Sequence, residues 1–125
     1  MKEKLPHVRH LHSDDKNFLK NNTFPTSRIH ISFINSVFYC MSSKRVKSVL
    51  LKLSRISEVI VLGEGMANLE DEYSKFIINP PCFQHPYKKW LNDLNFIESW
   101  SEEAPDPRPQ CNKFIVFRKK SEAIE

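Results

Sequence analysis

The sequence predicts an α/β fold: a mostly parallel sheet with helices packed on it, ending in an antiparallel strand pair. Residues 29–62 change from a strand pattern to a helix pattern and back, which is the order and size of a βαβ unit. The last two apolar segments are joined by a proline-rich loop with no crossover helix, so they are expected to pair antiparallel. A chain of 125 residues has room for one core, so residues 1–125 are predicted to form a single domain.

The first part of the predicted sheet contains two strands and the helix between them. The segment Ile29–Ile34 is rich in β-branched and aromatic residues and is predicted to be a strand. Ser42 and Ser43 can cap a helix whose apolar residues recur at spacings of three and four. These apolar residues are Val46, Val49, Leu50, Leu53 and Ile56. Val59–Leu62 has four apolar residues in succession, which is typical of a strand covered on both faces.

The middle of the chain is more broken. A short helix is predicted around Leu69–Phe76, and the residues Asn79, Pro80 and Pro81 that follow are predicted to form a turn. A second amphipathic helix is predicted to end at Asn95, because asparagine tolerates a left-handed backbone. The apolar face of this helix consists of Tyr87, Trp90, Leu91 and Leu94.

The C-terminal part predicts the antiparallel pair. Its strands are expected at Phe96–Trp100 and Phe114–Phe117, where apolar and aromatic residues gather. The stretch between them is predicted to be an exposed loop, since it contains Pro105, Pro107 and Pro109. Residues 121–125 are expected to be a frayed tail.

The composition argues against a glycine-rich phosphate-binding loop. Such loops need several glycines close together, because backbone amides must approach the ligand, and this chain has only 2 Gly. The chain has 19 Lys and Arg against 15 Asp and Glu, a net charge of +4, and the cations are spread along the sequence. Nucleic-acid binders usually concentrate their cations on one face, so a basic nucleic-acid-associated factor is kept here only as an alternative.

The cysteine spacing and the hydropathy indicate the cellular compartment of the protein and which partners it lacks. Cys40, Cys82 and Cys111 lie far apart, and an odd number without a secretory segment favours reduced thiols in the cytoplasm. A structural zinc site would need paired ligand spacing, which the sequence lacks, so no metal is expected. No segment has the length of a membrane span, so no membrane partner is expected either.

Five segments, in their order along the chain, carry a family resemblance. They are VRHLHSDDKNF, IHISFINSVFYCMSSKRVKSVLLKLSRI, SEVIVLGEG, YKKWLNDLNFIESW and NKFIVFRKK. Together, across about residues 8–120, they resemble the C-terminal half of a class I S-adenosylmethionine-dependent methyltransferase. The resemblance implies a partial Rossmann-like sheet with one reversed strand near its edge, and methyl transfer to an acceptor that the sequence does not identify.

The resemblance also implies roles for particular residues. Asp14 or Asp15 would help to hold the adenine of the cofactor, and Glu64 would act as a general base after the second strand. Contacts with the substrate would fall just beyond the end of the first strand, where ligands of open α/β sheets bind. The residues implied there are Asn35, Ser36 and Tyr39.

The glycine-rich cofactor loop of the family would lie before Met1, so the chain is expected to be a truncated or degenerate member. It is expected to use S-adenosylmethionine only if the missing N-terminal half is supplied, and to be inactive or incomplete alone. Gly63 and Gly65 could instead form a cofactor loop, but Asn68 stands where a third small residue is needed. The principal alternative is a non-enzymatic protein-binding module that forms a homo-oligomer or pairs with a partner chain completing the sheet.

Overall fold

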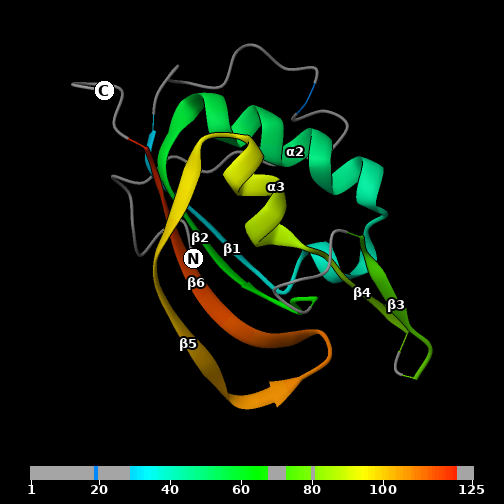
Figure 1. The fold of residues 1–125 in the computed structure, drawn as a ribbon. Coiled ribbons are helices and arrows are strands. Elements are labelled where there is room, and N and C mark those ends of the chain that lie inside the picture. The colour runs from blue at the N-terminus through cyan, green and yellow to red at the C-terminus, as the bar shows by residue number, and fades with distance from the viewer. Residues whose placement is uncertain (1–18, 20–28, 68–72, 80, 121–125) are drawn as a thin grey trace, which may run out of the picture.

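The computed structural model describes residues 19, 29–67, 73–79 and 81–120 (Figure 1). The elements, in chain order, are β1 (Ile29–Asn35), the one-turn 3-10 helix η2 (Phe38–Cys40), α2 (Ser43–Ile56), β2 (Ser57–Glu64), β3 (Lys75–Ile77), β4 (Cys82–Gln84), α3 (Tyr87–Asp93), β5 (Phe96–Arg108) and β6 (Cys111–Lys119). Four strands form one sheet in the order β1-β2-β6-β5, and β3 and β4 form a separate hairpin.

The prediction of a Rossmann-like, mostly parallel sheet with helices packed on it is wrong. Within the four-stranded sheet, β1 and β2 are the one parallel pair, whereas β6 pairs antiparallel with both β2 and β5. Strands make up 52% and helices 29% of the described residues, in which α2 and α3 are the two α-helices with defined bounds. The fold is therefore a mixed sheet with two helices. The physical reason is that the last strand inserts between β2 and β5 and takes antiparallel neighbours on both sides.

The unit formed by β1, α2 and β2 follows the sequence patterns closely. The side chain of Ser42 accepts a hydrogen bond from the backbone N–H of Arg45 at 3.5 Å, which caps α2 as predicted. The apolar stripe of α2 is buried at Val46, Val49, Leu50 and Leu53. Because the helix returns the chain to the same end of the sheet, β2 lies parallel to β1, with Ile31 opposite Val59 and Phe33 opposite Val61.

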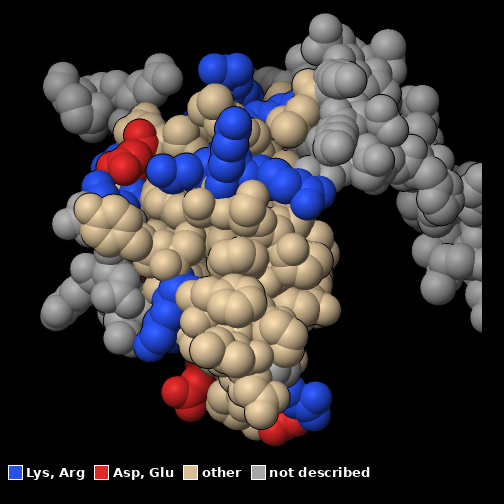
Figure 2. All heavy atoms as spheres, turned by 90° about the vertical axis from the view of Figure 1, so that its right-hand side faces the viewer, with Lys and Arg blue, Asp and Glu red and all other residues tan. Residues whose placement is uncertain are grey.

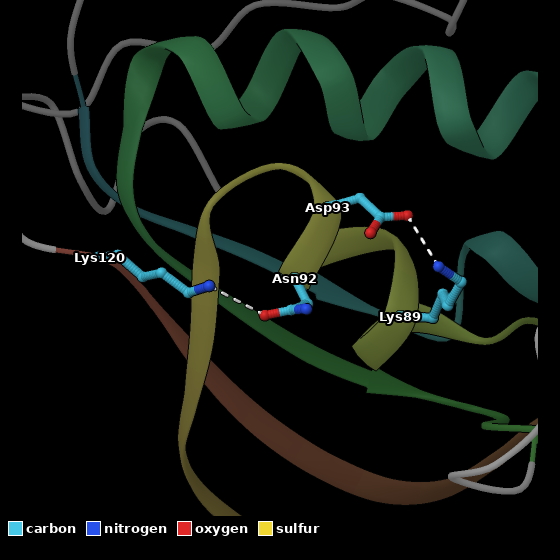
Figure 3. Close-up of polar contacts among 4 residues, drawn as sticks. All are labelled: Lys89, Asn92, Asp93 and Lys120. Atoms are coloured by element: carbon cyan, nitrogen blue, oxygen red, sulfur yellow. Dashed lines mark hydrogen bonds and ion pairs between the residues drawn. The ribbon is translucent and has the colours of Figure 1, made fainter.

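The helix α3 packs beside α2 on the same side of the sheet (Figure 1). Asn95 ends it with φ of 72°, as expected for a left-handed stop. Figure 3 shows the polar contacts at this end of the helix: Lys89 pairs with Asp93 at 3.3 Å, and the Lys120 ammonium donates to Asn92 Oδ1 at 3.1 Å. The backbone N–H of Lys120 also donates to the Asn95 carbonyl at 2.8 Å, so the end of β6 is tied to the turn that starts β5.

The antiparallel pair is present, but β5 extends eight residues beyond the predicted end at Trp100, to Arg108. Pro105 and Pro107 therefore belong to this strand and not to a loop. The register with β6 shifts between Glu103 and Arg108, which is the stretch that contains both prolines. An edge strand tolerates proline at such an irregularity, because no ladder N–H is needed there, and this explains why the loop prediction failed.

The prediction of a helix around Leu69–Phe76 is wrong for its described residues, 73–76. Residues 68–72 lie outside the described part, and Lys75–Ile77 forms β3, which pairs antiparallel with β4. Ile78, Asn79 and Pro81 form the turn between these strands, in agreement with the predicted turn. The ring centroids of Phe76 and Phe83 lie 5.0 Å apart across the hairpin, so cross-strand aromatic packing favours strands here.

Candidate functional site

The two faces of the four-stranded sheet differ sharply in what covers them. On one face, alternate residues of β2 and β6 point towards α2 and α3 and form the core with them. These sheet residues, Ile60, Leu62, Ile115 and Phe117, are at most 2% exposed. In the described part of the chain, no helix packs on the opposite face, which we call the open face. The predicted cover on both faces of residues 59–62 is therefore not found, since Val59 and Val61 are only half-buried.

The strand register arranges the open face in three rows across β1, β2, β6 and β5. The first row is Ile31, Val59, Arg118 and Ile97. The second row is Phe33, Val61, Val116 and Trp100. The third row is Asn35, Gly63, Phe114 and Glu102. The middle row is therefore entirely apolar, and the first and third rows each contain one charged residue, Arg118 and Glu102.

The exposure of this surface is unusual for large apolar side chains. Ile31 is 60%, Phe33 62%, Ile97 53% and Trp100 52% exposed. With strands spaced at their usual distance, three rows on four strands cover about 400 Å². Most of this area is apolar, and an exposed, largely apolar surface of this extent is in the range that marks functional surfaces on soluble proteins.

Two of the predicted substrate residues lie at one end of this face. Asn35 ends β1 beside Gly63 of the parallel strand β2, and Ser36 follows with φ of 54°. The backbone N–H of Ser36 donates to the Gly63 carbonyl at 2.7 Å, and its hydroxyl donates to Asn35 Oδ1 at 3.2 Å. The thiol of Cys111 approaches the same oxygen at 3.9 Å. These side chains form a small, exposed polar cluster.

Glu64 lies on the other side of the sheet from this cluster. Its carboxylate is fully buried, and Oε2 accepts the backbone N–H groups of Val37 at 2.8 Å and Phe38 at 3.2 Å. Burial raises the pKa of Glu64 to about 7, while the N–H groups of Val37, Phe38 and Tyr39 favour the charged form and limit the rise. The observed geometry is that of a carboxylate holding the η2 turn against the end of β2.

The predicted site is therefore divided by the sheet. Asn35 and Ser36 come together, Tyr39 is half-buried in η2, and Glu64 faces inward. Asp14 and Asp15 lie outside the described residues. The catalytic role of Glu64 stays a prediction, and in this conformation its carboxylate does not reach the surface on which Asn35 lies.

A buried histidine that the sequence did not single out forms the most connected polar group of the core. His85 Nε2 donates to the Met41 carbonyl at 2.9 Å, and its Nδ1 pairs with the Ser74 hydroxyl at 2.6 Å. Burial lowers the pKa of His85, so the neutral ring is favoured, with Nδ1 as the acceptor. The ring also stacks on Phe83, with centroids 5.5 Å apart. One sequence signal indicates that His85 is buried: it stands just before the aromatic residues Tyr87 and Trp90 of α3.

The two glycines after β2 do not leave an open cradle for a cofactor. A side chain at Gly63 would collide with the Phe114 ring, and one at Gly65 would collide with the Pro109 carbonyl. The space that the missing side chains leave is therefore filled by the Phe114 ring and by the backbone of the turn before β6. The described residues do not fit the phosphate-type loop that Gly63 and Gly65 could have formed.

The outer surface of α2 is basic. The helix carries five Lys and Arg and no acidic residue. At 100° per residue, the five cations fall within an arc of about 160° opposite the buried stripe. They are Lys44, Arg45, Lys47, Lys52 and Arg55. Figure 2 shows Lys and Arg side chains gathered across the upper part of the molecule, over α2.

Comparisons with known proteins do not assign this chain to a family. No protein-family model matches the sequence, and no curated protein matches it either. Among the described residues, no helix has the length and apolar character needed to cross a membrane. The candidate site is therefore the open face, which carries large exposed apolar side chains and has the polar cluster of Asn35 and Ser36 at one end.

Proposed function

We propose that this protein is a binding module that docks a protein partner on the open face of its sheet. One observation carries the proposal: four large apolar side chains, more than half exposed, stand in register on the two outer strands β1 and β5, while the opposite face is packed against α2 and α3. Leaving such a patch in water is costly, at about 25 cal/mol per Å² of apolar surface. A second apolar layer would remove that cost and complete a sandwich.

The chemistry of the open face favours protein over other partners. Arg118 is its one Lys or Arg among the twelve positions of the three rows, so the face lacks the cations that a phosphate backbone needs. Its middle row is flat and apolar, with polar groups at both ends, which is the arrangement of protein interfaces with an apolar centre and a polar rim.

Site-specific photocrosslinking tests this proposal. Phe33 is replaced by p-benzoylphenylalanine, and the protein is irradiated in cells of the organism that produces it. We expect one discrete crosslinked protein species from position 33, because Phe33 lies in the middle row. We also expect that adding Trp100→Glu to the same protein abolishes this species, since a charge in that row disrupts docking.

The matched control is the same replacement at Tyr73. This side chain is 82% exposed but lies before β3, outside the four-stranded sheet. Equal crosslinking from positions 33 and 73, or crosslinking from position 33 that survives Trp100→Glu, would reject the open face as a docking surface.

A second candidate function is methyl transfer from S-adenosylmethionine. It is favoured by the position of Asn35 and Ser36 at the carboxyl ends of the parallel pair β1 and β2, where ligands of open sheets bind. The glycines of the described part do not supply a cofactor cradle, so no reaction step is assigned. Titration calorimetry of the purified chain with S-adenosylmethionine tests it. Micromolar binding that Asn35→Ala removes and Ser101→Ala preserves would support this function, whereas no heat at millimolar ligand would count against it.

We also propose that the protein resides in a reducing compartment, the cytoplasm. The support is that Cys40, Cys82 and Cys111 are all free thiols, one of them exposed. Alkylation of the protein immediately on cell lysis, followed by mass spectrometry, should find all three cysteines modified without prior reduction. A disulfide-linked fraction would contradict this location.

A further inference from the structure

We infer that the occupant of the open face is a second copy of this chain, packed face to face with its strands reversed. The inference rests on the proposed docking function and names the partner. It follows from the positions of the two charges on the face. Arg118 stands in the first row on β6, and Glu102 stands in the third row on β5.

Two arrangements of two copies bring the middle rows together. A two-fold axis parallel to the strands keeps each row opposite itself and exchanges β6 with β2. Arg118 of one copy then faces Val59 of the other, and the two Arg118 positions are offset along the interface by only one strand spacing, roughly 5 Å, so that both side chains extend into the same part of it. Two guanidinium groups at this separation, on an apolar layer, repel each other.

An axis across the strands gives the opposite result. It places the first row of one copy over the third row of the other and keeps β6 over β6. Arg118 then lies over Phe114 of the second copy, with Glu102 of that copy on the neighbouring strand. A cation above an aromatic ring and beside a carboxylate is favourable, and the symmetry supplies the pair twice. The charges therefore select the reversed orientation.

The size of the surface sets the strength of this dimer. About 400 Å² of face on each copy gives an interface below the standard size, which corresponds to weak, concentration-dependent association. In the dimer, the two helix layers lie outermost, and the aromatic side chains Phe33 and Trp100 are shielded in the middle row.

Sedimentation velocity of the purified chain over a micromolar concentration series tests the inference. We expect a monomer–dimer equilibrium in the wild type. Arg118→Glu and Glu102→Arg, each alone, should weaken it by about tenfold, because each breaks both symmetric pairs. The double variant Arg118→Glu/Glu102→Arg should associate at least about threefold more tightly than either single variant, because the ion pair is re-formed with its charges exchanged, although the contact of a cation with Phe114 is lost.

The control variant Tyr73→Glu should leave the dimer unchanged, and circular dichroism verifies that all variants are folded. Single variants without effect, or a double variant that is weaker than either single, would overturn the reversed orientation. A wild type that stays monomeric throughout would overturn the second copy as occupant. If position 33 still crosslinks to a different protein in cells, the docking function survives that result. If position 33 crosslinks to nothing, both proposals fail.

Discussion

The carboxylate of Glu64 accepts the backbone N–H of Val37 at 2.8 Å, across a sequence separation of 27 residues. The contact joins the end of β2 to the segment that follows β1, so it stabilises the turn that connects β1 to α2. Glu64 Oε1 is buried and has no hydrogen-bond partner, and the Tyr87 hydroxyl is in the same condition. Burial raises the pKa of Tyr87, and the nearby charge of Glu64 raises it further. A buried acid in such surroundings makes stability depend on pH.

We expect the contribution of Glu64 to the free energy of unfolding to fall as pH rises from about 4.5 to about 7. The Glu64 carboxyl has its ordinary pKa of 4.5 in the unfolded chain and about 7 in the folded protein. Between these values the folded state binds more protons, so deprotonation favours unfolding, and the loss is complete above the folded pKa. The shift corresponds to about 3 kcal/mol. Urea unfolding at a series of pH values measures it.

Glu64→Gln is the control for this pH dependence, because it keeps an oxygen acceptor but does not titrate. His85, whose pKa is lowered by burial, destabilises the fold as pH falls below its ordinary value of 6.5, and it does so in both proteins. The difference between the two pH profiles therefore isolates Glu64. A difference that does not change with pH would show that the carboxyl titrates normally.

Removal of the Ser74 hydroxyl should destabilise the core. Ser74→Ala leaves Nδ1 of the buried His85 ring without its partner at 2.6 Å. An unsatisfied buried acceptor costs about 1–3 kcal/mol, so the thermal midpoint should fall by several degrees. Ser99→Ala, which removes an exposed hydroxyl at 3.4 Å from the Val116 carbonyl, should have a much smaller effect. Equal losses in the two variants would argue against a special role of the pair.

The two glycines after β2 should respond differently to substitution. Gly63→Ala brings a methyl group against the Phe114 ring, which is a side chain, whereas Gly65→Ala brings one against the Pro109 backbone carbonyl. Combining Gly63→Ala with Phe114→Leu should recover part of the lost stability, because the smaller side chain leaves room. The same second change should not rescue Gly65→Ala. Chemical denaturation of these four variants and of Phe114→Leu alone measures this coupling.

The left-handed residue after α3 gives a prediction about the backbone alone. Asn95 has φ of 72°, a conformation that costs a residue with a Cβ and no local polar compensation roughly 1–2 kcal/mol. Asn95→Ala should therefore destabilise the protein by about 1 kcal/mol, and Asn95→Gly should be neutral or slightly stabilising. Thermal unfolding compares the two variants. The opposite order would indicate that the Asn95 side chain, rather than its backbone, stabilises the turn.

Local elements were largely predictable, because their signals lie within a few residues. The cap at Ser42, the buried stripe of α2, the left-handed Asn95 and the parallel pairing of β1 with β2 all follow from short-range patterns. The pair β5 and β6 was also expected to be antiparallel. The length of β5 was not, since Pro105 and Pro107 read as loop residues unless the strand is known to lie at an edge.

The candidate site was less predictable. The sequence placed Asn35, Ser36 and Glu64 together, because each follows the end of a strand in a parallel pair. A residue at a strand end can point to either face of the sheet, however, and Glu64 turns inward while Asn35 lies in a row of the open face. The role of His85 depends on carbonyl groups more than 40 residues away, which no local pattern reveals.

The sequence by itself determined the helices α2 and α3, the strands β1 and β2, and which alternate residues of these strands share a face, because these depend on side-chain periodicity and local backbone preference. Only the tertiary structure decided that β6 lies between β2 and β5, that α2 and α3 cover the same side, and that Phe33 and Trp100 stay in water. The physical reason is that the alternation of side chains along a strand assigns each residue to one of two faces, but it does not determine what packs on either face. That choice is made by contacts between distant segments, and it leaves the open face available for a partner.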